Sequence, residues 1–365
     1  MKVDISVVGR ITEQCNFNCL YCYMDQKKNQ YMDLTTVENI IRKFQDYNDE
    51  IAHFTWIGGE PLLMPDKFFE HIIHYSKASN PKNLEVSHFI QTNGYFLDDK
   101  RINFLQNLGF KIGVSYDGSK ELQDNLRPIK CGKGTYDKLQ QNLTSANKSV
   151  GTITVITRLC YGKEREIYQN LKSLTKAASL NFYAPTGFGL GSEDRLLPTK
   201  DEAKEMMIRF YEMWRDDSNQ KFQLNPFAEI VRSFFNGMNK ICEYSTISCY
   251  RIIGIDVGGH VYTCSRSTHM PETFMGDVNH QNLNEILNSQ PHEAILNRYL
   301  KLKEEGCKYF SICSGGCPIE ALSHKKDFMD KTYYCCDVKG ELFKRIGEDL
   351  NNDKTRRSLE SRLFI

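Results

Sequence analysis

Glu13-Gln-Cys15-Asn-Phe-Asn-Cys19-Leu-Tyr-Cys22-Tyr-Met24 is the stretch of sequence that decides how this chain folds and works. Its three cysteines have the spacing Cys-x3-Cys-x2-Cys and come directly after a short β-rich run. Three thiolates this close together can bind three corners of a cuboidal iron–sulfur cluster, and no fourth cysteine follows in the loop. An incomplete ligand set leaves one coordination position open to a small molecule. Zinc is the alternative, although zinc motifs pair two Cys-x2-Cys arms or add histidines, and neither occurs nearby.

Outward from this motif, β-rich runs alternate with amphipathic helical patterns. Strands are predicted at residues 3–8, 53–57, 85–91, 111–116, 152–157 and 181–184. Between the first two, Val37, Ile40, Ile41 and Phe44 fall on one face of a helix predicted over residues 36–44. Repeated βα units indicate a parallel sheet, and six units are too few for a closed eight-stranded barrel. The predicted fold class is therefore α/β, with a partial (β/α)6 TIM-like barrel whose ligands bind at the carboxyl ends of its strands.

The second half of the chain lacks the regular alternation of β-rich and helical runs. Helical patterns cover residues 200–214 and 226–235, and residues 252–262 predict a β-hairpin that turns at Gly258-Gly259. We therefore predict a barrel over residues 1–197, a helical linker over 198–240, a small cysteine-rich domain with a hairpin and helices over 241–350, and a polar tail over 351–365. The tail is expected to fray because it is polar and terminal.

The bulk composition excludes several classes of protein. Lys plus Arg number 47 and Asp plus Glu 46 among 365 residues, so no net field attracts nucleic acid or an anionic membrane. No apolar run approaches the length of a membrane helix and no signal peptide is evident, so a cytoplasmic location is expected. Thirteen cysteines cannot all pair with one another, and disulfides are rare in the cytosol, which favours metal binding. Only Cys131 and Cys160 lie outside two clusters, and both are expected to be small buried residues.

The cysteine triplet, with Tyr21 just before its last member, resembles that of the radical S-adenosylmethionine (SAM) superfamily. Gly58-Gly59-Glu60-Pro61 resembles the glycine-rich motif that receives the ammonium of the methionine moiety, and Arg127 resembles the basic residue that pairs with its carboxylate. In the familiar form of that last loop a histidine stands where this chain has Gln123. The resemblance implies that SAM is bound by Tyr21, Gly58, Gly59, Glu60, Gln91, Asn93, Ser115, Asp117 and Arg127.

The resemblance also implies a mechanism. A four-iron cluster on Cys15, Cys19 and Cys22 would chelate SAM through its open iron. One electron would then cleave SAM to a 5′-deoxyadenosyl radical, which removes a hydrogen atom from the substrate. The aromatic residues Trp56, Phe182 and Tyr183 are candidates for lining that cavity, with core packing as the alternative for each.

The cysteines of the last third resemble those of the SPASM extension that follows some radical SAM barrels and binds two auxiliary four-iron clusters. The similarity covers roughly residues 241–338. It implies an inner cluster on Cys242, Cys249, Cys264 and Cys317, and an outer cluster on Cys307, Cys313 and Cys335. The family's first outer cysteine falls on Glu304, so we expect Cys336 or Glu304 as the fourth ligand, with an incomplete cluster as the alternative. The expected cofactors are SAM and three 4Fe-4S clusters, and a zinc ribbon is the competing interpretation of these cysteines.

Radical SAM enzymes with SPASM extensions mainly modify peptides and proteins. Chain length and the spacing of Cys249, Gly259 and Cys264 are similar to those of anaerobic sulfatase-maturating enzymes, which form formylglycine. That family places an Asp base after the cysteine equivalent to Cys264, whereas this chain has Ser265, whose hydroxyl is a poor general base. The sequence therefore favours an oxidoreductase that forms a thioether or carbon–carbon crosslink, or a related modification, in a ribosomally made precursor peptide. Sulfatase maturation is the first alternative, and a non-enzymatic iron–sulfur electron carrier or zinc module is the second; no catalytic residue is assigned.

The expected partners follow from this reaction. An electron donor such as flavodoxin or ferredoxin is needed, and the substrate is a precursor peptide. Only 14 residues precede Cys15, so the N-terminal peptide-recognition domain common in such enzymes is not expected. The leader of the peptide would bind the barrel itself, for example by adding a strand to an exposed sheet edge, or a separate leader-binding protein.

Overall fold

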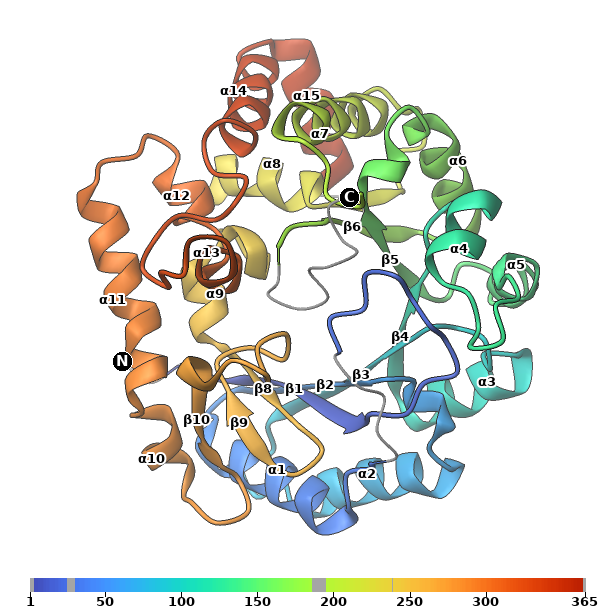
Figure 1. Cartoon of the computed structure of the whole chain (residues 1–365), viewed down its shortest axis with the longest axis vertical. Coiled ribbons are helices and arrows are strands. Elements are labelled where there is room, and N and C mark those ends of the chain that lie inside the picture. The colour runs from blue at the N-terminus through green and yellow to red at the C-terminus, as the bar shows by residue number, and fades with distance from the viewer. Residues whose placement is uncertain (1–2, 25–29, 186–194, 238, 364–365) are drawn as a thin grey trace.

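The computed structural model describes residues 3–24, 30–185, 195–237 and 239–363. Its strands form one ten-stranded sheet in the order β10-β9-β8-β1-β2-β3-β4-β5-β6-β7. The parallel strands of the barrel are β1 (Ser6–Thr12), β2 (Ile51–Gly58), β3 (Glu85–Thr92), β4 (Phe110–Ser115), β5 (Gly151–Ile156), β6 (Ala177–Phe182) and β7 (Gln223–Asn225). Figure 1 shows this sheet curving inside a ring of helices. The predicted α/β class with a partial TIM-like barrel is confirmed.

Helices connect successive barrel strands. They are α1 (Leu34–Tyr47), α2 (Asp66–Ala78), α3 (Asp99–Leu108), α4 (Lys120–Leu126), α5 (Tyr136–Ser145), α6 (Glu164–Leu174) and α7 (Lys200–Arg215). Helix α1 begins after Asp33, whose carboxylate accepts a hydrogen bond from the Thr36 N–H at 2.7 Å, and it buries the apolar face that the sequence predicts. Helix α7, which corresponds to the helix predicted over residues 200–214, begins with a capping box between Thr199 and Glu202.

Two details of the barrel differ from the prediction. Strand β6 begins at Ala177, whereas the sequence predicted a strand at residues 181–184. The residues Ala177-Ala-Ser179 lack β-branched and aromatic side chains, so their weak strand propensity hides the start of β6. Strand β7 pairs in parallel with β6 inside the region predicted as a helical linker, because three residues are too few to show an alternating pattern.

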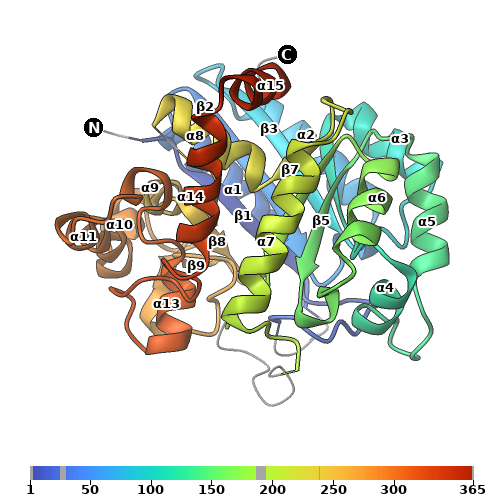
Figure 2. The same cartoon turned by 90° about the horizontal axis from the view of Figure 1, so that it is seen from above.

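The predicted hairpin is present, and it extends the barrel sheet. Strands β8 (Ile252–Ile255) and β9 (His260–Tyr262) pair antiparallel, and β8 pairs in parallel with β1 from Ser6↔Ile252 to Gly9↔Ile255. The other elements of this region are α8 (Phe227–Asn236), α9 (Thr246–Tyr250), β10 (Phe274–Asp277), α10 (Leu283–Leu287), α11 (Gln290–Glu304), α12 (Phe310–Cys313) and α13 (Pro318–Lys325). Figure 2 shows this cysteine-rich part on the side of the molecule opposite α3 to α6. The barrel and the cysteine-rich part therefore share one continuous sheet.

The C-terminal segment was expected to fray, and that prediction is wrong. Helix α14 (Lys339–Leu350) is followed by α15 (Asp353–Leu363). Leu359 and Leu363 of α15 are buried, and the Arg362 guanidinium lies 5.0 Å from the Trp214 ring centroid. The polar composition of this segment did not reveal that one narrow face of α15 is apolar. The aliphatic part of Arg362 packs on that face, while its guanidinium donates to backbone carbonyls.

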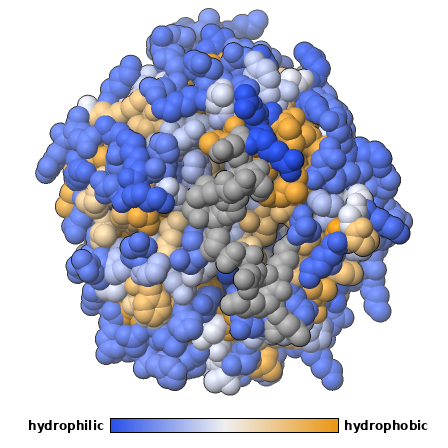
Figure 3. All heavy atoms as spheres, in the orientation of Figure 1, coloured by the Kyte–Doolittle hydropathy of each residue, from blue (hydrophilic) through white to orange (hydrophobic). Residues whose placement is uncertain are grey.

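Two cysteines, Cys131 and Cys160, lie outside the two cysteine clusters. Cys160 is buried as predicted, whereas Cys131 is exposed, contrary to prediction. The face drawn in Figure 3 is largely hydrophilic with smaller apolar patches. Among the helices of the described ranges, none has the length and apolar character needed to cross a membrane.

Candidate active site at the mouth of the barrel

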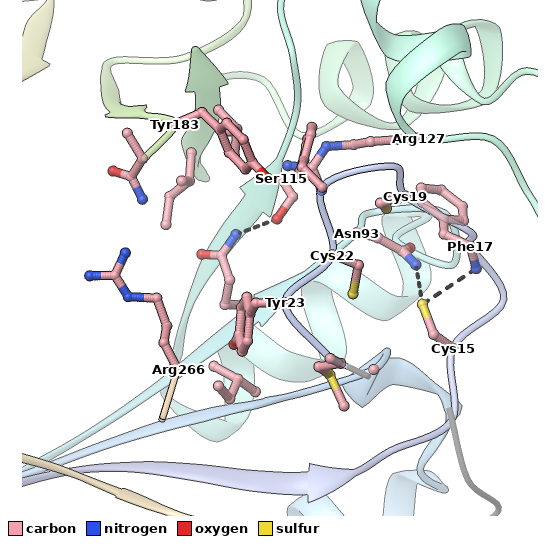
Figure 4. Close-up of a pocket in the computed structure, with 18 of the residues that line it drawn as sticks. Cys15, Phe17, Cys19, Cys22, Tyr23, Asn93, Ser115, Arg127, Tyr183 and Arg266 are labelled. Atoms are coloured by element: carbon pink, nitrogen blue, oxygen red, sulfur yellow. Dashed lines mark hydrogen bonds between the residues drawn. The ribbon is translucent and has the colours of Figure 1, made fainter. Parts of the chain in front are cut away.

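A cavity of about 260 Å³ lies at the carboxyl ends of the barrel strands. Cys15, Cys19 and Cys22 all line it, on the loop that follows β1 (Figure 4). The Phe17 N–H donates to Cys15 Sγ at 3.3 Å, and Asn93 Nδ2 lies 3.9 Å from the same sulfur. Hydrogen-bond donors directed at a sulfur stabilise the thiolate form that binds metal. The three cysteines predicted as cluster ligands are thus brought to one cavity.

The cysteine loop is fastened to the segment that follows α4. The N–H groups of Asn18 and Leu20 donate to the carbonyls of Pro128 and Leu126 at 2.8 and 2.9 Å. These bonds cross from the first strand's loop to the fourth strand's loop, so the loop position is determined by the barrel and not by local sequence alone.

Gly58 and Gly59 are required by a close backbone approach. A Cβ on Gly58 would lie 2.3 Å from the Thr12 carbonyl oxygen, and one on Gly59 would lie 2.1 Å from the Gln14 carbonyl oxygen. The Gly59 N–H donates to Thr12 O at 2.8 Å, which joins the end of β2 to the cysteine loop. Both glycines line the cavity, so the same absence of side chains also leaves room for a ligand.

Glu60, predicted to bind SAM, accepts three hydrogen bonds within the protein through its carboxylate, and its contact with SAM stays a prediction. It is fully buried, and it accepts from the Leu62 N–H (2.9 Å), Thr92 Oγ1 (2.6 Å) and the Asn93 N–H (2.7 Å). Burial raises the pKa of Glu60, although these donors act in the opposite direction. Glu60 is not among the described residues that line the cavity. It positions Asn93, which does line the cavity.

Gln91 and Ser115, at the ends of β3 and β4, lie together in the cavity wall as predicted. Gln91 Nε2 donates to Ser115 Oγ at 3.0 Å, a bond drawn in Figure 4. Asn93 also lines the cavity and donates to Asn16 Oδ1 at 2.8 Å. These amide and hydroxyl groups give the cavity donors and acceptors suited to a polar ligand.

Asp117, Arg127 and Tyr21 form a hydrogen-bonded cluster at the cavity wall. Asp117 Oδ2 accepts from Arg127 Nε at 2.9 Å and from the Tyr21 hydroxyl at 2.5 Å. The Arg127 guanidinium lies 5.0 Å from the Tyr21 ring centroid, and burial holds the pKa of Tyr21 well above its usual value. Arg127 and Tyr21 line the cavity, whereas Asp117 does not. Asp117 holds the Arg127 side chain through this ion pair, and the predicted contact between Asp117 and SAM stays a prediction.

Gln123 occupies the position at which the family resemblance leads one to expect histidine. Its side chain is fully buried; Oε1 accepts from the Asp117 N–H at 2.9 Å, and Nε2 donates to Thr135 Oγ1 at 2.9 Å. The departure has a structural explanation, since the amide satisfies one donor and one acceptor in a buried turn.

Several residues of the cavity wall were not predicted. Phe182 and Tyr183 line it, as considered from the sequence, whereas Trp56 is a core residue stacked on Phe54 and His88. The unforeseen members include four with polar side chains, Tyr23, Asn181, Glu243 and Arg266. Among the lining residues that the structure describes, Glu243 supplies the one carboxylate. Glu243 directly follows Cys242, and Arg266 lies two residues after Cys264. Nearness to a cysteine in the sequence was therefore the signal that could have identified both residues.

Two of the residues that line this cavity, Glu243 and Arg266, adjoin the predicted inner cysteines of the last third. The neighbouring Cys249, together with burial, raises the pKa of the Cys242 thiol. Burial raises the pKa of the Cys317 thiol, and Arg266 opposes that rise. Arg266 connects the inner cysteines to the cavity, because its N–H donates to Cys264 Sγ and its Nη2 to Cys317 Sγ, each at 3.4 Å. Its Nη1 donates to Glu243 Oε1, also at 3.4 Å. Arg266 thus contacts two of the four predicted inner ligands, Cys264 and Cys317.

The outer cysteines share a second, smaller cavity of about 20 Å³, lined by Cys307, Cys313, Cys335 and Cys336. Over the described ranges, no three His, Cys, Asp or Glu side chains converge closely enough to hold a single metal ion. A mononuclear site needs its sulfur ligands within about 2.3 Å of one ion, whereas the cysteines of a four-iron cluster bind different irons.

The donor sets fit the cofactors that the motifs imply. Three thiols face the first cavity together with the Arg127 guanidinium, which suits a partly liganded cluster and a carboxylate-bearing ligand. The polar side chains of Gln91, Asn93 and Ser115 suit a hydroxyl-rich nucleoside. Two further sets of four thiols are available in the last third.

The fold and the site define a radical SAM enzyme with a SPASM domain, and comparison with known proteins agrees. Residues 10–170 match the family model of the radical SAM superfamily, and residues 247–318 match that of the SPASM iron–sulfur cluster-binding domain. Among curated relatives is the cysteine-type anaerobic sulfatase-maturating enzyme of Clostridium perfringens (strain 13 / Type A), 24% identical over 342 residues, which are 89% of this chain and 91% of that one. The serine-type enzyme of Klebsiella aerogenes is 25% identical over 361 residues, 94% of this chain and 87% of that one.

Solved structures show the same architecture. Native anSMEcpe with bound AdoMet and the Kp18Cys peptide matches with a TM-score of 0.83 at 21% identity, covering 95% of this chain and 99% of that one. Streptococcus suis SuiB bound to its precursor peptide SuiA matches with a TM-score of 0.66 at 13% identity, covering 92% and 76%. At these identities the likeness concerns the fold.

Proposed function

We propose that this chain oxidises a cysteine or serine side chain of a protein substrate, in the manner of the anaerobic sulfatase-maturating enzymes. The observation that carries the proposal is a match to relatives of that name over both the barrel and the cysteine-rich part, with at least 87% of each chain covered in the two examples above. This favours sulfatase maturation over the peptide crosslinking that the sequence favoured.

The chain's own residues would divide the work as follows. Cys15, Cys19 and Cys22 would hold the SAM-binding cluster, and Arg127, oriented by Asp117, would bind the SAM carboxylate. When bound, the cluster and SAM supply a radical that removes one hydrogen atom from the substrate. Glu243 and Arg266 offer an acceptor and a donor to the backbone of a substrate peptide entering the cavity.

The reaction balances if a one-electron acceptor is present. Oxidation of the cysteine side chain removes two electrons and two protons; one electron and one proton leave together as the abstracted hydrogen atom. The second electron passes to an acceptor such as ferredoxin or flavodoxin, and the second proton to solvent. Water then replaces sulfur by oxygen and releases hydrogen sulfide, leaving an aldehyde.

The experiment uses the anaerobically reconstituted full chain with SAM, a reductant and an 18-residue sulfatase-type peptide bearing either cysteine or serine. We expect 5′-deoxyadenosine and a peptide aldehyde that reacts with a hydrazide. A variant with Cys15, Cys19 and Cys22 changed to alanine should form neither product. Formation of 5′-deoxyadenosine without any aldehyde from either peptide would refute the sulfatase-type reaction.

Crosslinking of a precursor peptide is the second candidate, and one observation favours it. Ser265 follows Cys264 where the sulfatase-maturating pattern has an acid, and its carbonyl is held by Arg10 Nη2 at 2.9 Å. A crosslinked product has lost two hydrogens but carries no aldehyde. The hydrazide therefore separates the two reactions even where the mass change from a serine peptide is the same.

A further inference from the structure

The outer cavity contains one thiol whose position the backbone determines in an unusual way. Cys336 has φ 54°, in the left-handed region that residues with a Cβ seldom adopt. This conformation costs roughly 1–2 kcal/mol for an ordinary residue. Cys335 and Cys336 lie in the turn before α14 and line the same cavity, with their sulfurs 3.4 Å apart.

We infer that Cys336 is the fourth ligand of the outer cluster, so that Cys307, Cys313, Cys335 and Cys336 form a complete four-thiolate set. All four line one cavity, although they come from three separate segments: the turn after α11, the end of α12 and the loop before α14. Four thiolates are the usual ligands of a four-iron cluster, and each loses its proton on binding. The inference concerns the outer site alone and does not depend on which substrate the enzyme oxidises.

The competing ligand, Glu304, is placed less well. It is the last residue of α11, it is exposed, and it is not among the described residues that line the outer cavity. A carboxylate would also be a harder ligand than the soft thiolates that iron–sulfur clusters select.

The surroundings of the outer cavity suit an anionic cluster. Lys331 and Lys339 are among its lining residues. Lys331 is paired with Glu305, and the ammonium of the buried Lys339 lies 4.2 Å from the Tyr244 ring centroid. Leu302, Phe310 and Phe343 supply apolar walls. A cation in a low-dielectric wall stabilises nearby thiolates more strongly than it would in water.

Exposure makes the inference testable without measuring activity. Cys336 and Cys131 are both exposed, so both should react with iodoacetamide if they are free. In anaerobically purified holoprotein we expect Cys131 to be alkylated and Cys336 to be protected. Chelation of the iron should make Cys336 reactive, and peptide mass spectrometry reads out both residues in one sample.

Substitutions give an independent readout. Cys336→Ala should lower iron and acid-labile sulfide by about a third, the share of one cluster in three. Cys131→Ala and Glu304→Gln should lower neither. SAM cleavage by the first cluster is assayed in parallel, so failure of the proposed function is distinguishable from failure at this site.

Three outcomes would overturn the inference. The first is full iron content in Cys336→Ala with a loss in Glu304→Gln. The second is alkylation of Cys336 in holoprotein that carries three clusters. The third is a disulfide between Cys335 and Cys336 in protein kept anaerobic and reduced throughout.

Discussion

Replacing Asp117 by asparagine tests whether the buried ion pair behind the cavity holds Arg127 in place. The Asp117 side chain has 0% exposure and that of Arg127 has 8%, with 2.9 Å between Arg127 Nε and Asp117 Oδ2. Asparagine keeps the volume and one acceptor oxygen but removes the negative charge, which leaves a guanidinium buried without a counter-charge. Breaking such a pair by removing one partner costs about 3–5 kcal/mol. Because one hydrogen bond is kept, we expect the lower end, about 3 kcal/mol of unfolding free energy.

The matched control is Asp137→Asn, which removes the same charge at the surface. Asp137 is paired with Lys120 at 2.6 Å, but the two side chains are 82% and 56% exposed. Exposed pairs of this kind contribute about 0–1 kcal/mol. The assay is urea unfolding of cluster-free, reduced protein followed by circular dichroism, in which a shift of the midpoint at constant slope reports the change in stability.

A third variant separates the charge from the packing. Adding Arg127→Met to Asp117→Asn removes the unpaired charge, so the double variant should be more stable than the sum of the single effects predicts. Two results would refute the reasoning: an Asp117→Asn effect no larger than that of Asp137→Asn, or strictly additive behaviour of Asp117→Asn and Arg127→Met.

Gly59→Ala should destabilise the protein by about 1–3 kcal/mol and lower the iron retained at the cysteine loop, since its Cβ would lie 2.1 Å from the Gln14 carbonyl oxygen. Gly347→Ala, in α14, should be neutral or stabilising in the same unfolding and iron assays, because its Cβ would meet Phe234 at 3.7 Å, an ordinary contact distance. Burial lowers the pKa of His88 from 6.5 to about 3. Between these two pH values, His88 is protonated in the unfolded chain but not in the folded protein, so the stability of the fold decreases as the pH drops below 6.5. Going from about pH 7.5 to about pH 5.5 should cost about 1.4 kcal/mol through His88, and His88→Gln should remove that part of the slope in urea unfolding. Thr199→Ala removes the side-chain cap of α7 and should cost about 1 kcal/mol by the same measurement, whereas an effect near zero would show that the cap is dispensable.

The barrel was predictable from sequence because its strands are rich in β-branched residues and its helices have a clear apolar face. The cysteine loop was predictable from the spacing of its cysteines, and the cavity-lining residues Gln91, Asn93, Ser115 and Arg127 were predicted from the resemblance to the radical SAM superfamily. Sheet geometry explains why the residues after successive parallel strands then meet at one edge. Strand β6 escaped accurate placement because its first residues have weak strand propensity.

The roles of two acids were not predictable from a motif. A motif shows that Glu60 and Asp117 occur at strand ends, but it does not show which partners their carboxylates have. Here backbone and hydroxyl donors occupy Glu60, and Arg127 with Tyr21 occupies Asp117. Both acids position residues that reach the cavity and do not line it themselves.

The contribution of the cysteine-rich part to the cavity depends on one strand pairing. Strand β8 adds to β1 in parallel, which carries the following hairpin and Cys264-Ser-Arg266 to the mouth of the barrel. A Cβ on Gly254 of β8 would lie 2.3 Å from the Ser265 N–H nitrogen, so this chain crossing is as tight as the one at Gly59. Arg10, on β1, then holds the Ser265 carbonyl at 2.9 Å. The backbone of Ser265 is therefore held against the barrel. Arg266 lines the cavity and donates to the thiols of Cys264 and Cys317. If this chain does form an aldehyde, it does so without an acid at position 265, and the polar groups that meet the substrate on that side are those of Glu243 and Arg266.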